Sequence, residues 1–517
     1  MSQEDFASND PSRARTFPEL IRAAATAYGD ETAIVLRDAS IPDEAATFRE
    51  LDEQSALLAR GMLARGVGKG TRIGFICANG PRFAIWFAAA ARIGAIAVPI
   101  STMIRANELV RVLRQSDVHG LYVQREILGK DYAERLCEAL PELAGAAPEL
   151  RLAKVPYLRW IISHGEELPA SFREASFLAD ASGEVDDAFL REVEREVHTS
   201  DQIVEIYTSG SMALPKGVKH AHGPVLFRSH YLARMQGARR GEEARAMMPM
   251  FWVGGLMMAM IPNWEVGAVT VCSERTLSNS RMAFGSVLSD EDLAVLSQAP
   301  KPWWGLGMSE TLGPYSYGDD FRAPGYPICA PMDHFADGYE VRIADEDDRP
   351  VGHGEIGEMQ LRGYPVATGL HKLERDGFYT ADGFFKTGDM CQVEDRAQGR
   401  RIHFVGRNGD MIKTMGSNVS PAEVEMEMQA LQGVDNAYVV GLPDTERGQL
   451  LVAAVIPRDG AELDFAEIEG ELRRRLSGYK VPRAYVAIKR EDVPLLASNK
   501  IARREIAAMM AQRLGRA

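Results

Sequence analysis

The sequence predicts an α/β protein: a large N-terminal domain of α/β subdomains, with a small β-rich subdomain, followed by a small α+β C-terminal domain. Three observations predict this class. Strand-like and helix-like patterns alternate through the first half, which favours a largely parallel sheet covered by helices. From about residue 324 to 408, glycine and proline become frequent and short strand-like runs dominate. A second alternation of helices and strands follows, so we expect domains over 1–408 and 409–517.

The elements of the first half are predicted from apolar periodicity. Runs rich in β-branched residues predict buried strands, whereas apolar residues spaced by three or four predict amphipathic helices. We expect strands at 32–36, 72–77, 95–98, 121–124, 203–207 and 268–272. We expect helices at 48–65, 82–93, 107–115 and 222–235. The charged segment 125–200 is predicted to be helical.

The second half contains shorter elements. In the β-rich subdomain we expect strands at 339–343, 357–362 and 401–405. In the C-terminal domain we expect strands at 437–441, 450–456 and near Tyr485, and helices at 421–431, 465–476 and from Ala502 onward. The C-terminal unit of about 110 residues has a normal domain size.

Charge balance and cysteine content exclude several classes of function. With 59 Lys and Arg against 73 Asp and Glu, the formal net charge of −14 disfavours non-specific binding to nucleic acid. Five scattered cysteines form no CxxC pair and no cluster with histidine, so we expect a reducing, cytoplasmic setting. The most apolar window, 251–262, is too short to span a bilayer, and the acidic N-terminus lacks the pattern of a signal peptide.

The segment 208–216, here called the phosphate loop, carries the strongest single signal for a ligand. It reads TSGSMALPK and follows the apolar run 203–207. Small residues let backbone N–H groups approach an anion, hydroxyl groups add donors, and Lys216 adds a positive charge, so a polyphosphate is the natural guest. Gly217 follows the lysine, so the segment does not match G-x-x-x-x-G-K-[ST]. A flexible surface loop is the alternative interpretation.

Four further segments follow in order along the chain. They are WGLGMSE at 304–310, a stretch ending in KTGD at 379–389, GRNGDMIK at 406–413 and SNKIARRE at 498–505. Each is weak alone, because Thr-Gly-Asp is usually a turn and a lysine in a polar loop is usually solvated. Their joint occurrence, in this order and at these spacings, is a strong signal.

Together these segments resemble the ANL superfamily of adenylate-forming enzymes, and most of all its acyl-CoA synthetases, from residue 17 to 511. Further support comes from FREL at 48–51, PMFWVGGL at 249–256 and GSNVSPAEVE at 416–425. Such enzymes activate a carboxylate with ATP, release pyrophosphate and pass the acyl group from AMP to a thiol. The resemblance therefore implies the use of ATP, Mg²⁺ and coenzyme A, with a small-molecule carboxylic acid as partner.

The resemblance also implies roles for single residues. The β- and γ-phosphates would be gripped by Thr208, Ser209, Gly210, Ser211, Met212 and Lys216. Glu310 would hold Mg²⁺, Asp389 would bind the ribose hydroxyls, and Arg407 would contact ribose or phosphate. Lys500, on a mobile C-terminal domain that rotates about residue 409, would bridge the carboxylate and the α-phosphate. The catalytic set is then Lys216, Glu310 and Lys500. Further nucleotide or coenzyme A contacts are implied for Gly285, Ser286, Gly307, Met308, Ser309, Lys413 and Gly416, and an acyl pocket for Phe251, Trp252, Gly254 and Gly255.

The chain departs from the superfamily pattern at several places. Met212 and Ala213 stand where a threonine and a glycine are usual, and Trp252 stands where a histidine is usual. Only 12 residues separate Cys272 from Gly285, where the superfamily has roughly 40 more, about one βαβ unit. That piece normally lines the acyl pocket. We therefore expect a carboxylate site that is open or remodelled, completed by a partner subunit, or impaired.

The leading hypothesis is an ATP-dependent acid–thiol ligase that makes an acyl-coenzyme A from an apolar fatty, alicyclic or aromatic acid. An adenylating enzyme that loads a carrier protein is one alternative. A non-catalytic nucleotide-binding protein with a reduced acyl pocket is another, although the retained residues Lys216, Glu310, Asp389, Arg407 and Lys500 argue against it. The sequence also leaves a homodimer open.

Overall fold

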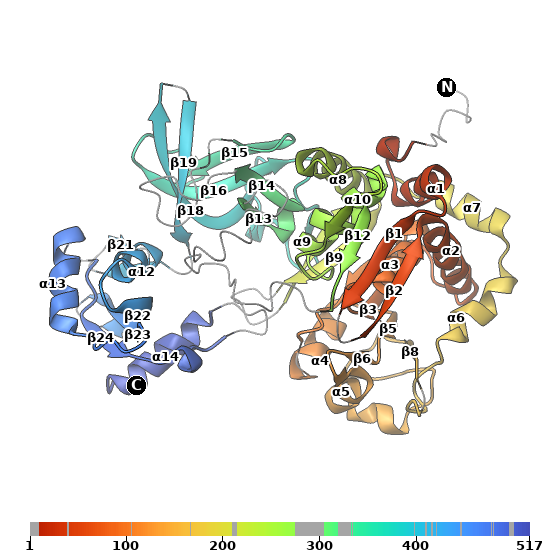
Figure 1. Ribbon diagram of the computed structural model, residues 1–517, viewed down its shortest axis with the longest axis horizontal. Helices are drawn as coiled ribbons and strands as arrows, with labels where there is room; N and C mark the ends of the chain where they lie inside the picture. Colours follow the sequence, from red (N-terminus) through yellow and green to blue (C-terminus); the bar gives the residue numbers. More distant parts are fainter. Residues whose placement is uncertain are drawn as a thin grey trace.

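The computed structural model describes residues 10–38, 41–104, 106–165, 167–208, 215–274, 304–318, 332, 334–397, 399–408, 411–414, 417–419, 421–444, 447–476, 478, 480–495 and 501–516. Figure 1 shows three groups of elements: two packed sheets with their helices at the N-terminal end, a β-rich group beside them, and a separate C-terminal group. The predicted α/β class with a large N-terminal and a small C-terminal unit is confirmed.

A seven-stranded sheet organises the first group. Its strand order is β17-β10-β9-β4-β3-β5-β8. The strands are β3 (Arg72–Ile76), β4 (Ile96–Pro99), β5 (Gly120–Val123), β8 (Trp160–Ser163), β9 (Gln202–Thr208), β10 (Lys216–Ala221) and β17 (Gly369–Leu370). The five strands from β9 to β8 are parallel, as predicted, while β10 runs antiparallel to both β9 and β17.

Helices cover both faces of this sheet. On one face lie α1 (Phe17–Tyr28), α2 (Phe48–Ala64) and α3 (Pro81–Arg92), and on the other α4 (Ala106–Gln115) and α5 (Tyr132–Ala139). Helix α2 begins with a capping box, in which Thr47 and Glu50 each bond the other's backbone N–H. Helix α3 is alanine-rich and almost fully buried, because it lies between two sheets.

A second sheet packs against the first through α3. Its order is β11-β12-β1-β2, from β1 (Thr32–Asp38), β2 (Ile41–Thr47), β11 (Glu243–Arg245) and β12 (Val269–Cys272). Helix α8 (His222–Gln236) and a continuous helical run cover it: α9 (Val253–Gly255), a π-helical turn (Leu256–Met260) and α10 (Ile261–Val266). The core between the sheets is aromatic, since Phe17 contacts both Phe87 and Trp264.

The segment 125–200 differs from its predicted helical character. It contains the buried strand β8 and the short pair β6 (Glu126–Ile127) and β7 (Lys130–Asp131), besides α6 (Ser176–Ala181) and α7 (Asp187–Arg195). Strand β8 is a run of only four residues in a charged region, and a run this short gives no periodic signal. Tertiary pairing with β5 decides its conformation.

The β-rich group consists of an antiparallel meander and a hairpin. The meander contains β15 (Tyr339–Ala344), β16 (Ile356–Gly363), β18 (Phe385–Arg396) and β19 (Gly399–Arg407), in that order. The hairpin contains β13 (Trp304–Met308) and β14 (Gly313–Gly318). Strand β17 comes from the same part of the chain but pairs with β10 of the main sheet, so this group is tied directly to the first.

The C-terminal group is a small α+β unit. Its sheet contains β20 (Ile412–Thr414), β21 (Ser417–Val419), β22 (Val434–Asp444), β23 (Gly448–Pro457) and β24 (Ala484–Ala487). Helices α12 (Pro421–Gln429) and α13 (Phe465–Arg475) pack on one face and α14 (Arg503–Arg513) on the other. Arg503 of α14 donates two hydrogen bonds to Glu425 of α12, which joins the two faces.

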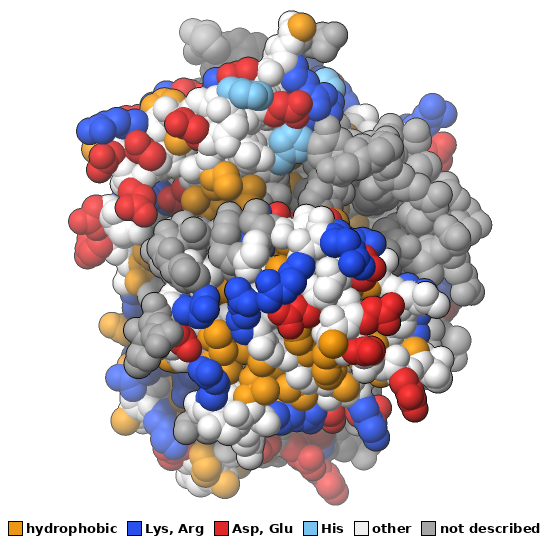
Figure 2. All heavy atoms as spheres, turned by 90° about the vertical axis from the view of Figure 1, so that its left-hand side faces the viewer, with side chains coloured by type: hydrophobic (Ala, Val, Ile, Leu, Met, Phe, Trp, Pro, Cys, Tyr) orange, Lys and Arg blue, Asp and Glu red, His pale blue; other side chains and the backbone are white. Residues whose placement is uncertain are grey.

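The face of the molecule that carries the C-terminal group is mixed in charge. Figure 2 shows Lys, Arg, Asp and Glu side chains interspersed with apolar ones on this side. On α13, Arg473 pairs with Glu469, and Arg474 pairs with Glu471. The described residues of this face thus carry charges of both signs.

The part of the chain that the structure describes was also searched for membrane spans. None of its helices combines the length and the apolar character needed to cross a bilayer.

Candidate active site

The phosphate loop closes a β-hairpin. Strand β9 ends at Thr208 and β10 begins at Lys216, and these two residues are partners in the antiparallel register. The sequence placed Lys216 within the loop, whereas it is the first residue of β10, because pairing with β9 continues to that position. The Nζ of Lys216 lies 4.6 Å from the ring centre of Phe378, over its face. Ser209, Gly210, Ser211 and Met212 lie outside the described residues.

The segment around Glu310 lies against this hairpin. His220 on β10 is fully buried, and burial lowers its pKa to about 4, so its ring is neutral. The ring Nε2 lies 2.7 Å from the carbonyl oxygen of Ser309 and donates to it. The carbonyl of Glu310 accepts a hydrogen bond of 2.7 Å from the backbone N–H of Ala367. Glu310 is thus fixed between β10 and the segment that leads into β17.

Gly307, two residues before Ser309, is required by packing. A Cβ atom there would lie 2.3 Å from the carbonyl oxygen of Gly313 on the facing strand β14. The neighbouring Met308 caps the short helical turn that carries Glu310, and its backbone N–H donates to the hydroxyl of Thr311 at 3.1 Å. The glycine therefore lets β13 and β14 approach closely beside Glu310.

Asp389 and Arg407 meet across the strand pair β18–β19. They are register partners, and the Nε of Arg407 lies 2.6 Å from Oδ1 of Asp389. The carboxylate is buried, with only 1% of its side chain exposed, whereas half of the Arg407 side chain is exposed. The turn before it is fixed by Thr387, whose hydroxyl accepts from the Asp389 N–H, and by Gly388, whose N–H donates to Glu358.

Burial dominates the electrostatics of Asp389. It raises the pKa of this carboxyl to about 6, against the opposing effects of Arg407 and the Tyr315 hydroxyl. The nearby carboxylates of Glu310 and Glu358 raise the pKa further. Glu310 and Asp389 therefore lie close enough for their charges to interact, although about 80 residues separate them in sequence.

The remaining predicted site residues lie in other places. Phe251 and Trp252 contact each other edge to face at 5.5 Å, beside the buried start of α9. Gly254 and Gly255 serve packing there, since a Cβ on Gly254 would lie 2.3 Å from the Met248 sulfur. Lys413 is the middle residue of β20, in the C-terminal group. Gly285, Ser286, Gly416 and Lys500 lie outside the described residues.

A large cavity that the sequence did not indicate lies at the carboxyl ends of β3, β5 and β8. Its volume is about 840 Å³. Strand β3 continues into α3 and then β4, whereas β5 continues the opposite way to β8, so the cavity lies where the strand order reverses. Ligands of open α/β sheets bind at such switch points.

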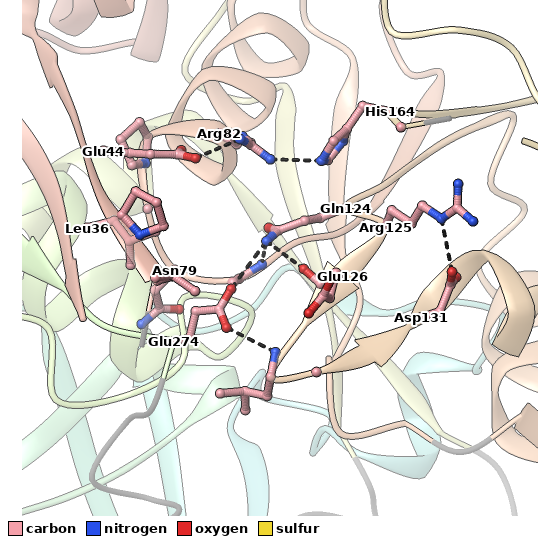
Figure 3. Close-up of a pocket in the computed structure, with 18 residues that line it drawn as sticks. Leu36, Glu44, Asn79, Arg82, Gln124, Arg125, Glu126, Asp131, His164 and Glu274 are labelled. Atoms are coloured by element: carbon pink, nitrogen blue, oxygen red, sulfur yellow. Dashed lines mark hydrogen bonds and ion pairs between the residues drawn. The ribbon is translucent and has the colours of Figure 1, made fainter. Parts of the chain in front are cut away.

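The walls of this cavity contain both polar and apolar side chains. Figure 3 shows Arg82 between Glu44 and His164. The Arg82 Nη2 lies 2.6 Å from Glu44, and its Nη1 lies 2.9 Å from the His164 Nε2. The apolar part of the lining consists of Leu36, Ile41, Pro42, Ala78, Pro81 and Leu128. Glu274 closes one end, where it accepts a hydrogen bond of 3.0 Å from the backbone N–H of Leu128.

A smaller cavity of about 20 Å³ lies next to the large one. The two share Ala78, Asn79 and Glu274. The small cavity is otherwise lined by Thr102, Met103, Ile127, Pro249 and Phe251. Phe251 is therefore the residue of the predicted acyl pocket that comes nearest to the cavity system.

Comparison with protein families identifies the family to which this chain belongs. The family model of the AMP-binding enzyme matches residues 21–303, and that of the AMP-binding enzyme C-terminal domain matches residues 423–500. The chain belongs to the AMP-binding enzyme family. The predicted membership of the adenylate-forming superfamily, and of its acyl-CoA synthetase type, is confirmed.

Individual members of the AMP-binding enzyme family cover nearly the whole chain. It is 27% identical to the feruloyl-CoA synthase of an Amycolatopsis species, over 89% of this chain and 93% of the relative. It is 26% identical to the mitochondrial medium-chain acyl-CoA ligase ACSF2 of Mus musculus, over 96% and 88%. The ATP-bound structure of MatB from Rhodopseudomonas palustris has the same fold, with a TM-score of 0.72 at 19% identity over 94% of this chain and 96% of MatB.

Proposed function

We propose that this enzyme activates a carboxylic acid as its acyl-adenylate at the site between Thr208, Glu310 and Asp389, and then transfers the acyl group to the thiol of coenzyme A. One observation carries the proposal. Direct hydrogen bonds join the phosphate-loop hairpin to the Glu310 turn, and the Asp389–Arg407 pair lies close enough to Glu310 for the two carboxylates to interact, so the three features lie together on one surface. A nucleoside triphosphate and an acid require such a surface, because two anions must be held together.

The residues of this surface match the parts of ATP in chemical type. Lys216 and the hydroxyl of Thr208 suit phosphate oxygens, and the buried Asp389 carboxylate suits ribose hydroxyls. Arg407 lies at the exposed side of Asp389, where it can reach ribose or phosphate as well.

A magnesium ion fits this surface only together with the nucleotide. Among the described residues, no group of three His, Cys, Asp or Glu side chains could hold a metal by itself. Mg²⁺ often binds to one carboxylate plus substrate phosphates, so Glu310 is the residue that would hold it. The ion, when bound, supplies positive charge that neutralises the phosphates.

The reaction is a displacement at phosphorus followed by an acyl transfer. A carboxylate oxygen forms a bond to the α-phosphorus while the bond to the β-phosphate bridging oxygen breaks, and pyrophosphate leaves. The thiol sulfur then attacks the acyl carbon, loses its proton, and AMP leaves. Lys216 stabilises charge on the phosphates in the first step, and Asp389 holds the ribose in place through both steps. We propose two further requirements. Lys500 bridges the carboxylate and the α-phosphate in the first step, and the C-terminal unit rotates about residue 409 before the acyl transfer.

The acid, in this proposal, lies with its distal part in the large cavity. The apolar lining of that cavity suits a fatty, alicyclic or aromatic group, and its volume lies within the range of small-molecule sites. Two arginines lie among the described lining residues, and both are engaged: Arg82 by Glu44 and His164, and Arg125 by Asp131. Neither is an isolated positive charge for a second carboxylate.

The test is AMP release that requires ATP, Mg²⁺, coenzyme A and an acid, measured over a library of carboxylic acids. Release with at least one acid is expected, and its absence with every acid would refute the proposal. Lys500→Ala should abolish adenylation without a change in thermal stability. Replacement of coenzyme A by a phosphopantetheine carrier protein checks the acceptor. A cytoplasmic location and a homodimer stay predictions, which fractionation and light scattering check.

A further inference from the structure

A cluster of charged and polar side chains, built around the fully buried Glu205, lies beneath the phosphate-loop hairpin. It consists of Arg72 on β3, Asp117 after α4, Glu205 and Tyr207 on β9, His371 after β17, and Lys372. We call it the anchor cluster. Its members come from four separate parts of the chain, and none is among the residues that would contact ATP.

Glu205 is the centre of the anchor cluster and is fully buried. One of its carboxylate oxygens accepts from the Tyr207 hydroxyl at 2.5 Å, and the other accepts from the Arg72 Nε at 3.1 Å. The amide of Gln202 lies 3.3 Å from the second oxygen. Burial of a carboxylate is costly unless the group is hydrogen-bonded or paired with a positive charge. These bonds to Tyr207, Arg72 and Gln202 therefore keep the Glu205 side of β9 buried.

His371 bridges the cluster in a defined protonation state. Its Nδ1 lies 3.2 Å from the Arg72 Nη2, and its Nε2 lies 3.1 Å from an oxygen of Asp117. A guanidinium can only donate, so Nδ1 accepts and the Nε2–H donates to Asp117. The imidazole is neutral in this arrangement, and burial lowers its pKa in the same sense.

The anchor cluster reaches both ends of the phosphate loop. The backbone N–H of His371 donates to the carbonyl of Gly217 at 2.7 Å, one residue after Lys216. Tyr207 is the residue before Thr208 and faces Gly217 in the register. A Cβ on Gly217 would lie 2.7 Å from the Glu205 carboxylate, so β10 rests directly on the cluster. Thr208 and Lys216 are therefore held by the residues that immediately flank them.

We propose that His371 is a positioning residue for ATP: as a neutral bridge between Arg72 and Asp117, it holds β10 against β9 and so fixes the separation of Thr208 and Lys216. The inference rests on the proposed function, because it assumes that these two residues bind a triphosphate. Without the bridge, Arg72 and Asp117, whose side chains are each 20% exposed, lose a hydrogen-bond partner and the hairpin gains freedom. ATP must then restrict that freedom when it binds, and its affinity falls.

The experiment measures the dissociation constant of ATP with Mg²⁺ by calorimetry, in the absence of any acid. His371→Ala is expected to weaken ATP binding about tenfold, which is the lower end of the effect of losing one hydrogen bond to a charged group. His371→Gln should restore affinity to within about twofold of the wild type, because glutamine can also accept from Arg72 and donate to Asp117. His403→Gln is the matched control: His403 pairs with Glu394 at 2.7 Å on β19, outside the cluster, and its loss should leave ATP affinity unchanged.

Four outcomes distinguish failure of the inference from failure of the proposed function. If His371→Ala binds ATP as tightly as the wild type, the inference is wrong. If the wild type itself binds no ATP, the proposed function fails instead. In steady-state assays KM for ATP should rise while KM for the acid stays constant, and an equal rise in both would also overturn the inference. Should His371→Ala not fold, Tyr207→Phe removes only the hydroxyl that bonds Glu205, and an unchanged ATP affinity there would refute the anchoring role.

Discussion

Removal of the Arg407 guanidinium should move the pH dependence of nucleotide binding. The carboxyl of Asp389 has a pKa of about 6, raised by burial and partly opposed by the adjacent positive charge of Arg407. A ribose hydroxyl donates more strongly to this group when it is ionised, because the bond is then charge-assisted. ATP binding by the wild type should therefore weaken as the pH falls through about 6. Arg407→Gln removes the charge that favours ionisation, so the pH at which binding weakens should rise.

The size of this change follows from the contact. The Arg407 Nε and the Asp389 Oδ1 form an ion pair at 2.6 Å, and an opposite charge this close lowers the pKa of a carboxyl by about 1–3. Half of the Arg407 side chain is exposed, so solvent screening favours the lower end of that range. We expect the pKa of Asp389 in Arg407→Gln to rise by about one, to roughly 7.

The assay is ATP affinity measured between pH 5.5 and 8.5. Arg407→Gln also removes a proposed ligand contact, so affinity should fall at every pH, and the position of the inflection is the informative quantity. Arg400→Gln on the same strand is the control, because Arg400 pairs with Asp395 at the far end of β19. An inflection that stays near pH 6 in Arg407→Gln would refute the electrostatic coupling.

The same carboxyl has a consequence for stability. Its folded-state pKa lies above the ordinary value of 3.8, so its contribution to stability is fully present below about pH 3.8 and is lost as the pH rises through about 6. The difference corresponds to about 3 kcal/mol. Asp389→Asn should therefore raise the free energy of unfolding at pH 8 relative to the wild type while abolishing ribose recognition. Equal stability of the two proteins at pH 8 would contradict the burial argument.

Three further predictions concern other parts of the site. Lys216→Ala should weaken ATP binding about 10- to 100-fold in calorimetry, from loss of one charge-assisted contact; an unchanged affinity would remove Lys216 from the phosphate site. Ala78→Leu, which adds volume between the two cavities, should raise KM for the bulkiest acids and leave ATP affinity unchanged; equal effects on all acids would place the acid elsewhere. Gly307→Ala should lower the free energy of unfolding by about 1–3 kcal/mol in denaturant titrations, because its Cβ meets the Gly313 carbonyl; full stability would contradict that close contact.

The sequence predicted most of the regular elements, because their apolar periodicity is local. Strands β1, β3 and β9 and helices α2, α3 and α8 lie within two residues of the predicted bounds. Strands β2 and β10 were not predicted, because IPDEAAT and KGVKHA are polar and lack a strand pattern. They pair because a neighbour is present: β1 for β2, and both β9 and β17 for β10.

The candidate site likewise contains residues that the sequence could name and features that it could not predict. Glu310, Asp389 and Arg407 could be named from short motifs, since each motif is a turn with a characteristic order of residues. The large cavity and the anchor cluster could not be predicted, because they depend on residues far apart in sequence. Arg72 and His371 are separated by 299 positions, and neither lies in a motif. Only the packing of β17 on β10 brings them within hydrogen-bond distance.

The two-residue strand β17 also covers part of a sheet edge. It covers β10, whose backbone would otherwise form the open edge of the seven-stranded sheet. Open edges pair readily with other chains. A shortened form of the protein that ends before residue 366 would keep every parallel strand of the sheet and still expose this edge. Such fragments should aggregate, so removal of the C-terminal unit alone, after residue 408, is the truncation that preserves a well-behaved nucleotide-binding portion.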